Sequence, residues 1–361
     1  MINRDRYNKD NKKKLIERLN EEGDNVDGTD DAGEISLGST VEDQNEESET
    51  KKVSGRRYLI WLIPVLLVAL TTTAFFLLRT RPERQEYIIP RFSDSSSADV
   101  AQDVPVADPV SRCRRSNAEK PEINAKSYVV VYSDDFQVAL QKDSGTSAPF
   151  ASIVKILGSL VALDYYDLDQ QLALKESVDA QGNGLDLGVG ETLSVEDLMG
   201  AALIGSKNDA MYVLAQNYPG GQHGFLTAMQ EKSRVIGLSD TSVVNVIGLD
   251  SSDQYSTPMD IAVLSIVAMR NPVIAGFAGR SSYSVTTSTG RTESFASTNP
   301  LLGNVDGVIG LKTGYTLNAG LCLVTYVDDK RDFVVVVLNA EDRGEESRKI
   351  IEWVRSNYEC N

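Results

Sequence analysis

The stretch Ala148-Pro149-Phe150-Ala151-Ser152-Ile153-Val154-Lys155-Ile156-Leu157 decides both the fold and the chemistry expected of this chain. Pro149 suits the start of a helix, and the residues that follow it have good helical character. Positions i and i+3 share a helix face, so Ser152 and Lys155 are expected to point the same way. A lysine among apolar neighbours has a lowered pKa, because lost solvation disfavours its charged form. The pattern predicts a serine nucleophile with a lysine base, although Ser-x-x-Lys alone also fits a helix start with a solvent-reaching lysine.

Two further triplets follow in the chain. Ser206-Lys207-Asn208 comes after the apolar helical stretch Ala201-Ala202-Leu203-Ile204, and Lys312-Thr313-Gly314 ends an apolar strand. Each triplet is common by itself. Their order, and their settings on a helix, a helix-flanking loop and a strand, are not common.

Elements are expected on both sides of these motifs. Strands are predicted over 127–132 and 136–140, and helices over 150–166, 194–217, 222–236 and 258–270. Strand patterns return over 308–311, 320–327 and 332–338, before a final amphipathic helix over 345–358. Strands from both ends with helices between them predict a non-sequential sheet closed by the domain termini. That sheet would bring Cys113 near Cys360.

The three motifs resemble the D-alanyl-D-alanine carboxypeptidases of the low-molecular-weight penicillin-binding proteins, over about residues 121–340. Tyr255-Ser256-Thr257-Pro258-Met259-Asp260-Ile261-Ala262 and Thr298-Asn299-Pro300-Leu301-Leu302 also resemble that family. The resemblance implies an α/β (α+β) penicillin-binding/β-lactamase-like fold, with an antiparallel sheet built from both chain ends and a helical subdomain. Asn245-Val246-Ile247-Gly248-Leu249 and Gln254 depart from the family pattern, which leaves the loop architecture near the site open.

The resemblance also implies roles for the matching residues. Ser152 would attack the carbonyl of the penultimate D-Ala, Lys155 would act as general base, and Ser206 would pass a proton to the leaving nitrogen. The substrate-binding residues would be Asn208, Lys312, Thr313, Gly314 and Tyr315. The N–H groups of Ser152 and Tyr315 would form the oxyanion hole. No metal or organic cofactor is needed in this scheme.

The function implied is removal of the terminal D-Ala from peptidoglycan pentapeptides, with β-lactam antibiotics expected to bind. A DD-endopeptidase acting on cross-links would use the same residues. A class A-like β-lactamase needs a deacylating Glu, and no convincing Glu-x-x-Leu-Asn follows the second motif. A non-catalytic wall-binding module would be marked by loss of Ser152, Lys155 or Lys312, and all three are present.

Composition excludes several other chemistries. The net charge of −16 has the wrong sign for a nucleic-acid partner. The single histidine, His223, is expected on an exposed loop, and one histidine cannot build a His₂ or His₃ metal site. The cysteines lack CxxC spacing. A Cys113–Cys360 disulfide is permitted if the domain is exported, and two unrelated thiols are the alternative.

The chain divides into four segments. Residues 1–57 are polar and charge-rich and are expected to form a disordered cytoplasmic tail. Residues 58–78 carry no charge and are long enough for one transmembrane helix, which needs about 20 apolar residues. Residues 79–120 are expected to be an extracytoplasmic linker, and 121–361 the peptidase domain. Basic residues flank the span on both sides, so the expected orientation rests on the function of the domain.

Overall fold

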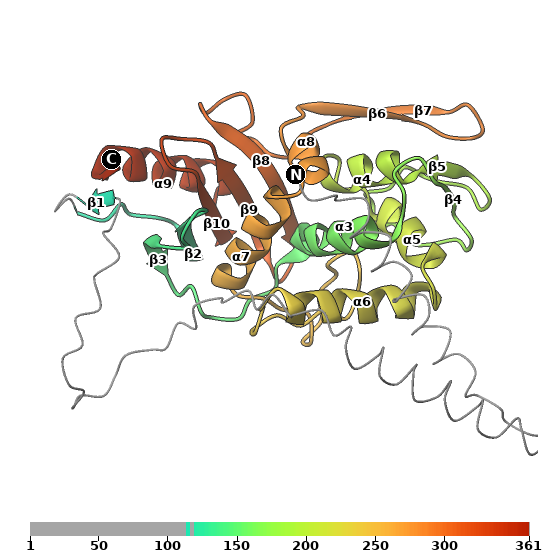
Figure 1. Cartoon of the computed structure of the whole chain (residues 1–361), viewed down its shortest axis with the longest axis horizontal. Coiled ribbons are helices and arrows are strands. Elements are labelled where there is room, and N and C mark those ends of the chain that lie inside the picture. The colour runs from blue at the N-terminus through green and yellow to red at the C-terminus, as the bar shows by residue number, and fades with distance from the viewer. Residues whose placement is uncertain (1–112, 116–118, 361) are drawn as a thin grey trace, which may run out of the picture. The chain divides into compact units, whose positions relative to one another are not determined.

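The computed structural model describes residues 113–115 and 119–360 (Figure 1). The predicted tail, membrane span and most of the linker lie outside the described residues. The elements, in chain order, are β1 (Cys113–Arg115), β2 (Ala125–Tyr132), β3 (Val138–Lys142), η1 (Ala151–Ile153), α3 (Val154–Tyr165), β4 (Gln171–Ala173), β5 (Thr192–Ser194), α4 (Val195–Leu203), α5 (Asn208–Asn217), α6 (Gly221–Val235), α7 (Pro258–Met269), α8 (Pro272–Ala278), β6 (Ser282–Thr286), β7 (Thr292–Ala296), β8 (Val308–Thr316), β9 (Gly320–Val327), β10 (Phe333–Ala340), α9 (Arg343–Asn357) and β11 (Tyr358–Cys360).

The central sheet has five antiparallel strands in the order β3-β2-β10-β9-β8. β2, from the start of the domain, pairs with β10, from its end, in the register Val130↔Val335. The prediction of an antiparallel sheet built from both chain ends is therefore confirmed. In this order β8 has a strand neighbour on one side only, so it is an edge strand of the sheet.

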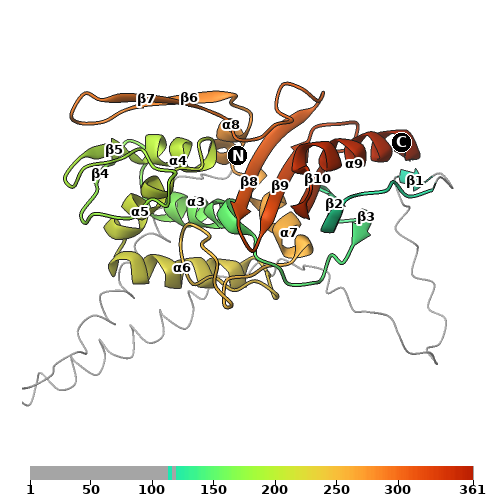
Figure 2. The ribbon, with the colours of Figure 1, turned by 180° about the vertical axis from the view of Figure 1, so that it is seen from behind.

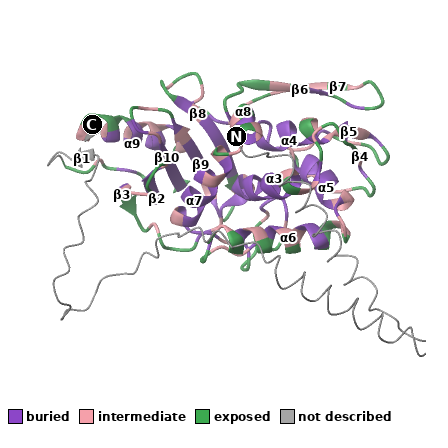
Figure 3. Cartoon of the chain, in the orientation of Figure 1, coloured by how far each residue is buried: buried purple, intermediate pink, exposed green. Residues whose placement is uncertain are grey.

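Runs of valine in β2 and β10 are explained by cores on both faces of the sheet. Val129 and Val131 belong to the core shared with α3 and α7, whereas Val130 belongs to the core beneath α9. Side chains alternate between the faces of a strand, so a strand covered on both faces is apolar throughout instead of alternating. Figure 3 shows this continuous burial through the sheet.

The helical subdomain packs around α3, which is buried along most of its length. The helix predicted over 194–217 is wrong as one element, because it divides into α4 and α5 with a break at Ile204–Lys207. Ser206, in this break, has a φ of 59°, a left-handed conformation that cannot continue a right-handed helix. The break places the second motif in a turn. His223 is exposed as expected, but it lies in the first turn of α6 and not in a loop.

Two two-stranded sheets missing from the sequence predictions flank this subdomain. β4 pairs with β5, and β6 pairs with β7. The β6–β7 hairpin lies beside α4 in both views (Figures 1 and 2). Tyr283 of β6 donates to Asp197 of α4 at 3.1 Å, and its ring occupies the space where a Cβ on Gly200 would lie. The hairpin is thus fastened to the helical subdomain.

The first and last strands meet at the end of the domain. β1 and β11 pair antiparallel, and their register places Cys113 opposite Cys360. The expected proximity of these two residues along the backbone is therefore confirmed. Among the described residues, no single helix is long and apolar enough to cross a membrane. Within this described part, only α7 and α8 taken together have the length and composition of a membrane span, and the chain bends by 106° between them.

Candidate active site

The predicted nucleophile lies in a turn directly before α3. Ser152 is in the 3-10 turn η1, so the prediction of one helix over 150–166 is wrong at its start. Ala151 has a φ of 49°, a strained conformation for a residue with a Cβ, and it keeps the turn out of the α-helix. The three-residue offset still brings the two side chains together: Lys155 Nζ donates to Ser152 Oγ at 2.6 Å.

A main-chain carbonyl completes this pair. Lys155 Nζ also donates to the carbonyl oxygen of Ile247 at 3.2 Å, and Ser152 Oγ lies 3.4 Å from the same oxygen. Ile247 therefore fixes both side chains without using its own. Sequence reasoning missed this contact, because a carbonyl oxygen is present at every residue and leaves no mark in the sequence.

The loop around Ile247 is held by side-chain amides. Asn245 Oδ1 accepts from the N–H groups of Gly248 at 2.7 Å and Leu249 at 2.9 Å. Gln254, which is buried, accepts from the N–H groups of Val244 and Asn245 through Oε1. The segment 245–249 and Gln254 thus form an amide-braced loop. Asn245-x-x-Gly248 is a turn signal that could have indicated it.

The second and third motifs meet at one contact. Lys312 Nζ donates to Ser206 Oγ at 2.7 Å and to the carbonyl oxygen of Thr313 at 3.0 Å. Ser206 is held in its left-handed conformation in the turn between α4 and α5, while Lys312 projects from β8. The predicted residues Ser152, Lys155, Ser206 and Lys312 therefore form two hydrogen-bonded serine–lysine pairs.

Burial governs the charge on the two lysines. Lys155 and Lys312 are 0% and 1% exposed, and their recorded partners are uncharged oxygens. Burial lowers the pKa of Lys155 well below its ordinary value, and the charge on Lys312 lowers it further. Burial, and then the charge of Arg343, lower the pKa of Lys312 to about 7. Strand β8, which carries Lys312, packs against η1, which carries Ser152, so both pairs lie in one site.

Edge strand β8 passes close to the nucleophile turn. A Cβ on Gly314 would lie 2.9 Å from the carbonyl oxygen of Phe150 and 3.0 Å from the Cβ of Ala151, so only glycine allows this approach. Thr313 is buried and shares a 2.5 Å hydrogen bond with the hydroxyl of Thr298. Tyr315 is 60% exposed.

Asn208 starts α5 at the edge of the site. Its Nδ2 donates to the carbonyl oxygen of Ala180 at 2.8 Å. Its Oδ1 is buried without a hydrogen-bond partner. A buried acceptor without a donor is costly, and this oxygen has no exposed surface through which a ligand could reach it.

Two charged residues near the site had no role assigned from the sequence. Arg343, at the start of α9, donates to the carbonyl oxygen of Gly314 at 3.0 Å and adds positive charge beside Lys312. The role of Lys207 had no assignment, and the structure supplies one. Its Nζ binds Glu293 of β7 and the carbonyl oxygen of Gly184, each at 2.8 Å. Lys207 therefore joins the β6–β7 hairpin to the loop before β5.

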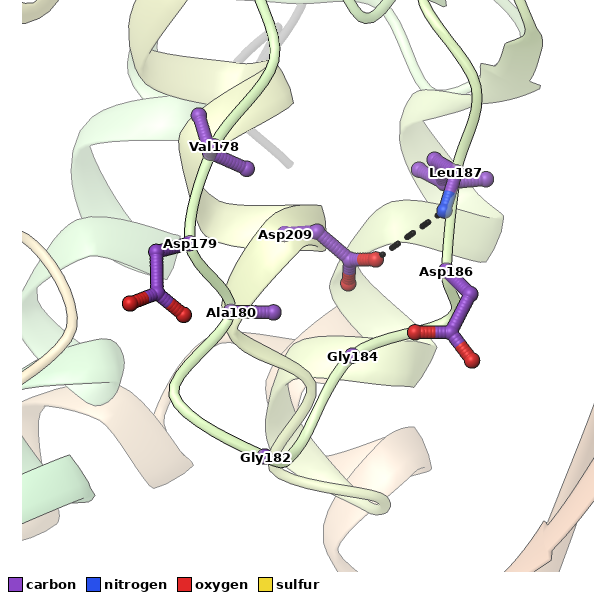
Figure 4. A pocket seen from close by; sticks show the side chains of 8 residues that line it. All are labelled: Val178, Asp179, Ala180, Gly182, Gly184, Asp186, Leu187 and Asp209. Carbon is purple, nitrogen blue, oxygen red and sulfur yellow. Dashed lines mark hydrogen bonds between the residues drawn. The ribbon is translucent and has the colours of Figure 1, made fainter.

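A cavity of about 290 Å³ lies between that loop and α5. Asp179, Asp186 and Asp209 are among the residues that line it, as Figure 4 shows. Asp209 points into the loop and accepts from the N–H groups of Leu185 at 2.7 Å and Leu187 at 3.4 Å. None of the four residues of the serine–lysine pairs lines this cavity, which therefore does not mark the reaction site.

Comparisons with known proteins agree with this geometry. The sequence model of a family described as D-alanyl-D-alanine carboxypeptidase matches residues 114–342. A D-alanyl-D-alanine endopeptidase of Pseudomonas aeruginosa is 33% identical over 225 residues, which cover 61% of this chain and 72% of that protein. The D-alanyl-D-alanine carboxypeptidase DacF of Bacillus subtilis is 27% identical over 247 residues. That match covers 66% of this chain and 64% of DacF, just under two thirds of its length.

Solved structures share the fold. A D-alanyl-D-alanine carboxypeptidase from Mycobacterium tuberculosis superposes with a TM-score of 0.63 at 26% identity, over 67% of this chain and 96% of that one. The Streptomyces K15 DD-transpeptidase superposes with a TM-score of 0.63 at 24% identity, over 66% of this chain and 100% of that one. At that identity the second likeness shows the fold alone.

Proposed function

The chain belongs to the D-alanyl-D-alanine carboxypeptidase family of serine peptidases, and we propose that it removes the terminal D-Ala from peptidoglycan stem peptides through an acyl-enzyme on Ser152. The observation that carries this proposal is the 2.6 Å contact between Ser152 Oγ and the amine of fully buried Lys155. A lysine whose pKa is lowered by burial is neutral often enough to accept the serine proton.

Acylation then follows from the positions of the two pairs. Ser152 Oγ forms a bond to the carbonyl carbon of the penultimate D-Ala, and its proton moves to Lys155 Nζ. The tetrahedral intermediate collapses when the bond to the terminal D-Ala nitrogen breaks. That nitrogen leaves as an amine after taking a proton, which Lys155 supplies through the hydroxyl of Ser206. Water hydrolyses the Ser152 ester and restores the free hydroxyl.

The substrate binds along strand β8, beside the buried basic side chains around that strand. An extended peptide can lie along an exposed strand edge, and β8 is such an edge. The terminal carboxylate binds Lys312 and Thr313, and the positive charge of Arg343 supports this site. Asn208 holds the substrate backbone, while the N–H groups of Ser152 and Tyr315 bind the developing oxyanion. No step in this scheme uses a metal or an organic cofactor.

The experiment compares two substrates with one domain. The segment from 113 to 361 is incubated with a pentapeptide ending in D-Ala-D-Ala, and separately with a cross-linked stem-peptide dimer. Free D-Ala is measured in the first reaction and monomer in the second, each beside a Ser152→Ala variant. We expect D-Ala release that disappears in the variant. No release from a folded wild-type domain would contradict the carboxypeptidase proposal.

Cleavage of cross-links is the second candidate function. The Pseudomonas aeruginosa relative, named an endopeptidase, is 33% identical, compared with 27% for the Bacillus subtilis carboxypeptidase. Both reactions use the same nucleophile and differ in what occupies the leaving side of the cleaved bond. Monomer release with no D-Ala release would favour the endopeptidase.

Residues 58–78 are proposed to anchor the enzyme as a single-pass helix, with residues 1–57 inside the bacterial cell and the catalytic domain outside. The uncharged run of sequence and the location of peptidoglycan support this topology. Protease added to intact spheroplasts should remove the domain and spare a tag at residue 1. Protection of the domain would contradict the proposed orientation.

A further inference from the structure

Ser206 occupies a backbone conformation that it does not adopt freely. Its φ of 59° lies in the left-handed region, where the Cβ of a non-glycine residue is crowded. In this conformation its hydroxyl receives the hydrogen bond from Lys312 at 2.7 Å. Strained residues persist where the surrounding structure holds them, so the contacts of the peptide groups on either side of Ser206 identify what holds it.

One side chain binds both of those peptide groups. Asn183 Nδ2 donates to the carbonyl oxygen of Gly205 at 3.2 Å and to that of Ser206 at 3.0 Å. The carbonyl oxygen of Asn183 also accepts from the N–H of Asn208 at 2.8 Å. Asn183 therefore spans the whole turn of the second motif, on both sides of the strained residue.

The segment that carries Asn183 is itself fixed. Asp209 accepts from the N–H of Leu185, and Lys207 donates to the carbonyl oxygen of Gly184. Figure 4 shows the bond from Asp209 to the N–H of Leu187 in the same loop. On the other side, Arg291 Nη1 donates to the carbonyl oxygen of Leu185 at 2.7 Å. Residues at the start of α5 and in the loop between β6 and β7 thus fix the segment of Asn183 on two sides. Its amide can therefore keep the backbone of Ser206 from relaxing to negative φ.

We propose that Asn183 is a positioning residue for Ser206. Its amide clamps the carbonyl groups that flank Ser206, keeps φ positive and holds the hydroxyl within reach of Lys312. Without the amide, the turn relaxes toward negative φ and the hydroxyl moves away from the path of the proton. The inference rests on the proposed function, because it assigns Ser206 to proton transfer toward the leaving nitrogen.

The experiment measures two reactions of the domain. Acylation by a fluorescent penicillin gives a second-order rate constant, and D-Ala release gives kcat and KM. Asn183→Ala removes the amide, and Asn183→Asp keeps the size of the side chain but removes the donors. A misplacement of about 1 Å costs on the order of 100-fold in rate. We therefore expect both variants to lower acylation and kcat by roughly 10- to 100-fold with little change in KM.

Gln216→Ala is the matched control. Gln216 binds the same loop at Lys175 and Glu176 through its own amide, and these hydrogen bonds involve neither Gly205 nor Ser206. This variant should keep acylation and kcat within a factor of about two. The melting temperature of every variant is recorded beside the rates, so that a loss of folded protein is not counted as a loss of rate.

A double-mutant cycle tests whether Asn183 acts through Ser206. In a Ser206→Ala background, Asn183→Ala should cause little further loss, because the group that it positions is gone. An equal further loss in that background would overturn the inference, as would wild-type rates in the folded Asn183→Ala or Asn183→Asp domain. A wild-type domain silent in both reactions would instead overturn the proposed function.

Discussion

Lys155 and Lys312 are both fully buried in one site, and the charge on Lys312 helps to lower the pKa of Lys155. The two lysines have the same ordinary pKa, but in this site they can carry different charges. Each charge suits a different task. Lys155 acts as a base only when neutral, whereas Lys312 binds a carboxylate best when charged.

The pH dependence of kcat/KM should be bell-shaped. On the acid side, kcat/KM falls as Lys155 gains a proton and can no longer accept one from Ser152. On the alkaline side, kcat/KM falls as Lys312 loses its proton, with a pKa of about 7 before substrate binds. A bound carboxylate raises that pKa, so the alkaline limb of kcat should lie at higher pH than that of kcat/KM. Stopped assays across pH measure both.

Lys312→Arg tests the assignment of the alkaline limb. A guanidinium stays charged throughout the accessible pH range, so the variant should have a lower rate but no alkaline limb near that of the wild type. An alkaline limb at the same pH in this variant would assign it to another group.

Lys155→Met should raise stability while it abolishes acylation. Lys155 is buried among apolar residues and bonds only to the uncharged oxygens of Ser152 and Ile247 in the recorded contacts. An apolar side chain of similar length removes the cost of desolvating the amine, so the free energy of unfolding should rise by about 1–2 kcal/mol. Urea unfolding measures it. A clear fall in stability would show that the amine is a net structural contributor.

Gly248→Ala should disrupt the nucleophile turn. Gly248 has a φ of +91°, and an added Cβ would lie 2.0 Å from the carbonyl oxygen of Ala151. The clash adds to the cost of positive φ, so we expect a loss of roughly 3 kcal/mol in stability and severe loss of acylation. Gly290 is the control, because it has a φ of +83° and open space for a Cβ. Gly290→Ala should cost about 1–2 kcal/mol and leave acylation unchanged; equal effects on acylation would contradict the steric account.

If the domain is exported as proposed, a disulfide between Cys113 and Cys360 is expected, because the strand register places these residues opposite each other. Alkylation of the denatured, unreduced domain should label Cys322 alone, and reduction should add label at both other cysteines. Reduction should also lower the free energy of unfolding by about 2–4 kcal/mol. Label on Cys113 without reduction would show two free thiols instead.

The sequence predicted the parts of the site that local patterns determine. The offset from Ser152 to Lys155 and the apolar strand before Lys312 are local features, and the structure brings each into the expected place. The second motif was expected in a helix-flanking loop, but the predicted helix over 194–217 ran across the break before α5, because Ala201 to Asn217 is compatible with one helix until the distant amide of Asn183 is considered. The contribution of Ile247 was also missed, since it is made by a main-chain carbonyl. Long-range main-chain contacts have no residue signature.

The most direct test of the central claim is the mass of the acyl-enzyme. The domain is mixed with benzylpenicillin, quenched in acid within seconds and digested, and the peptides are analysed by mass spectrometry. The account predicts one penicilloyl adduct, on the peptide that contains Ser152, and none in Ser152→Ala. An adduct on another serine, or D-Ala release from the Ser152→Ala domain, would contradict it.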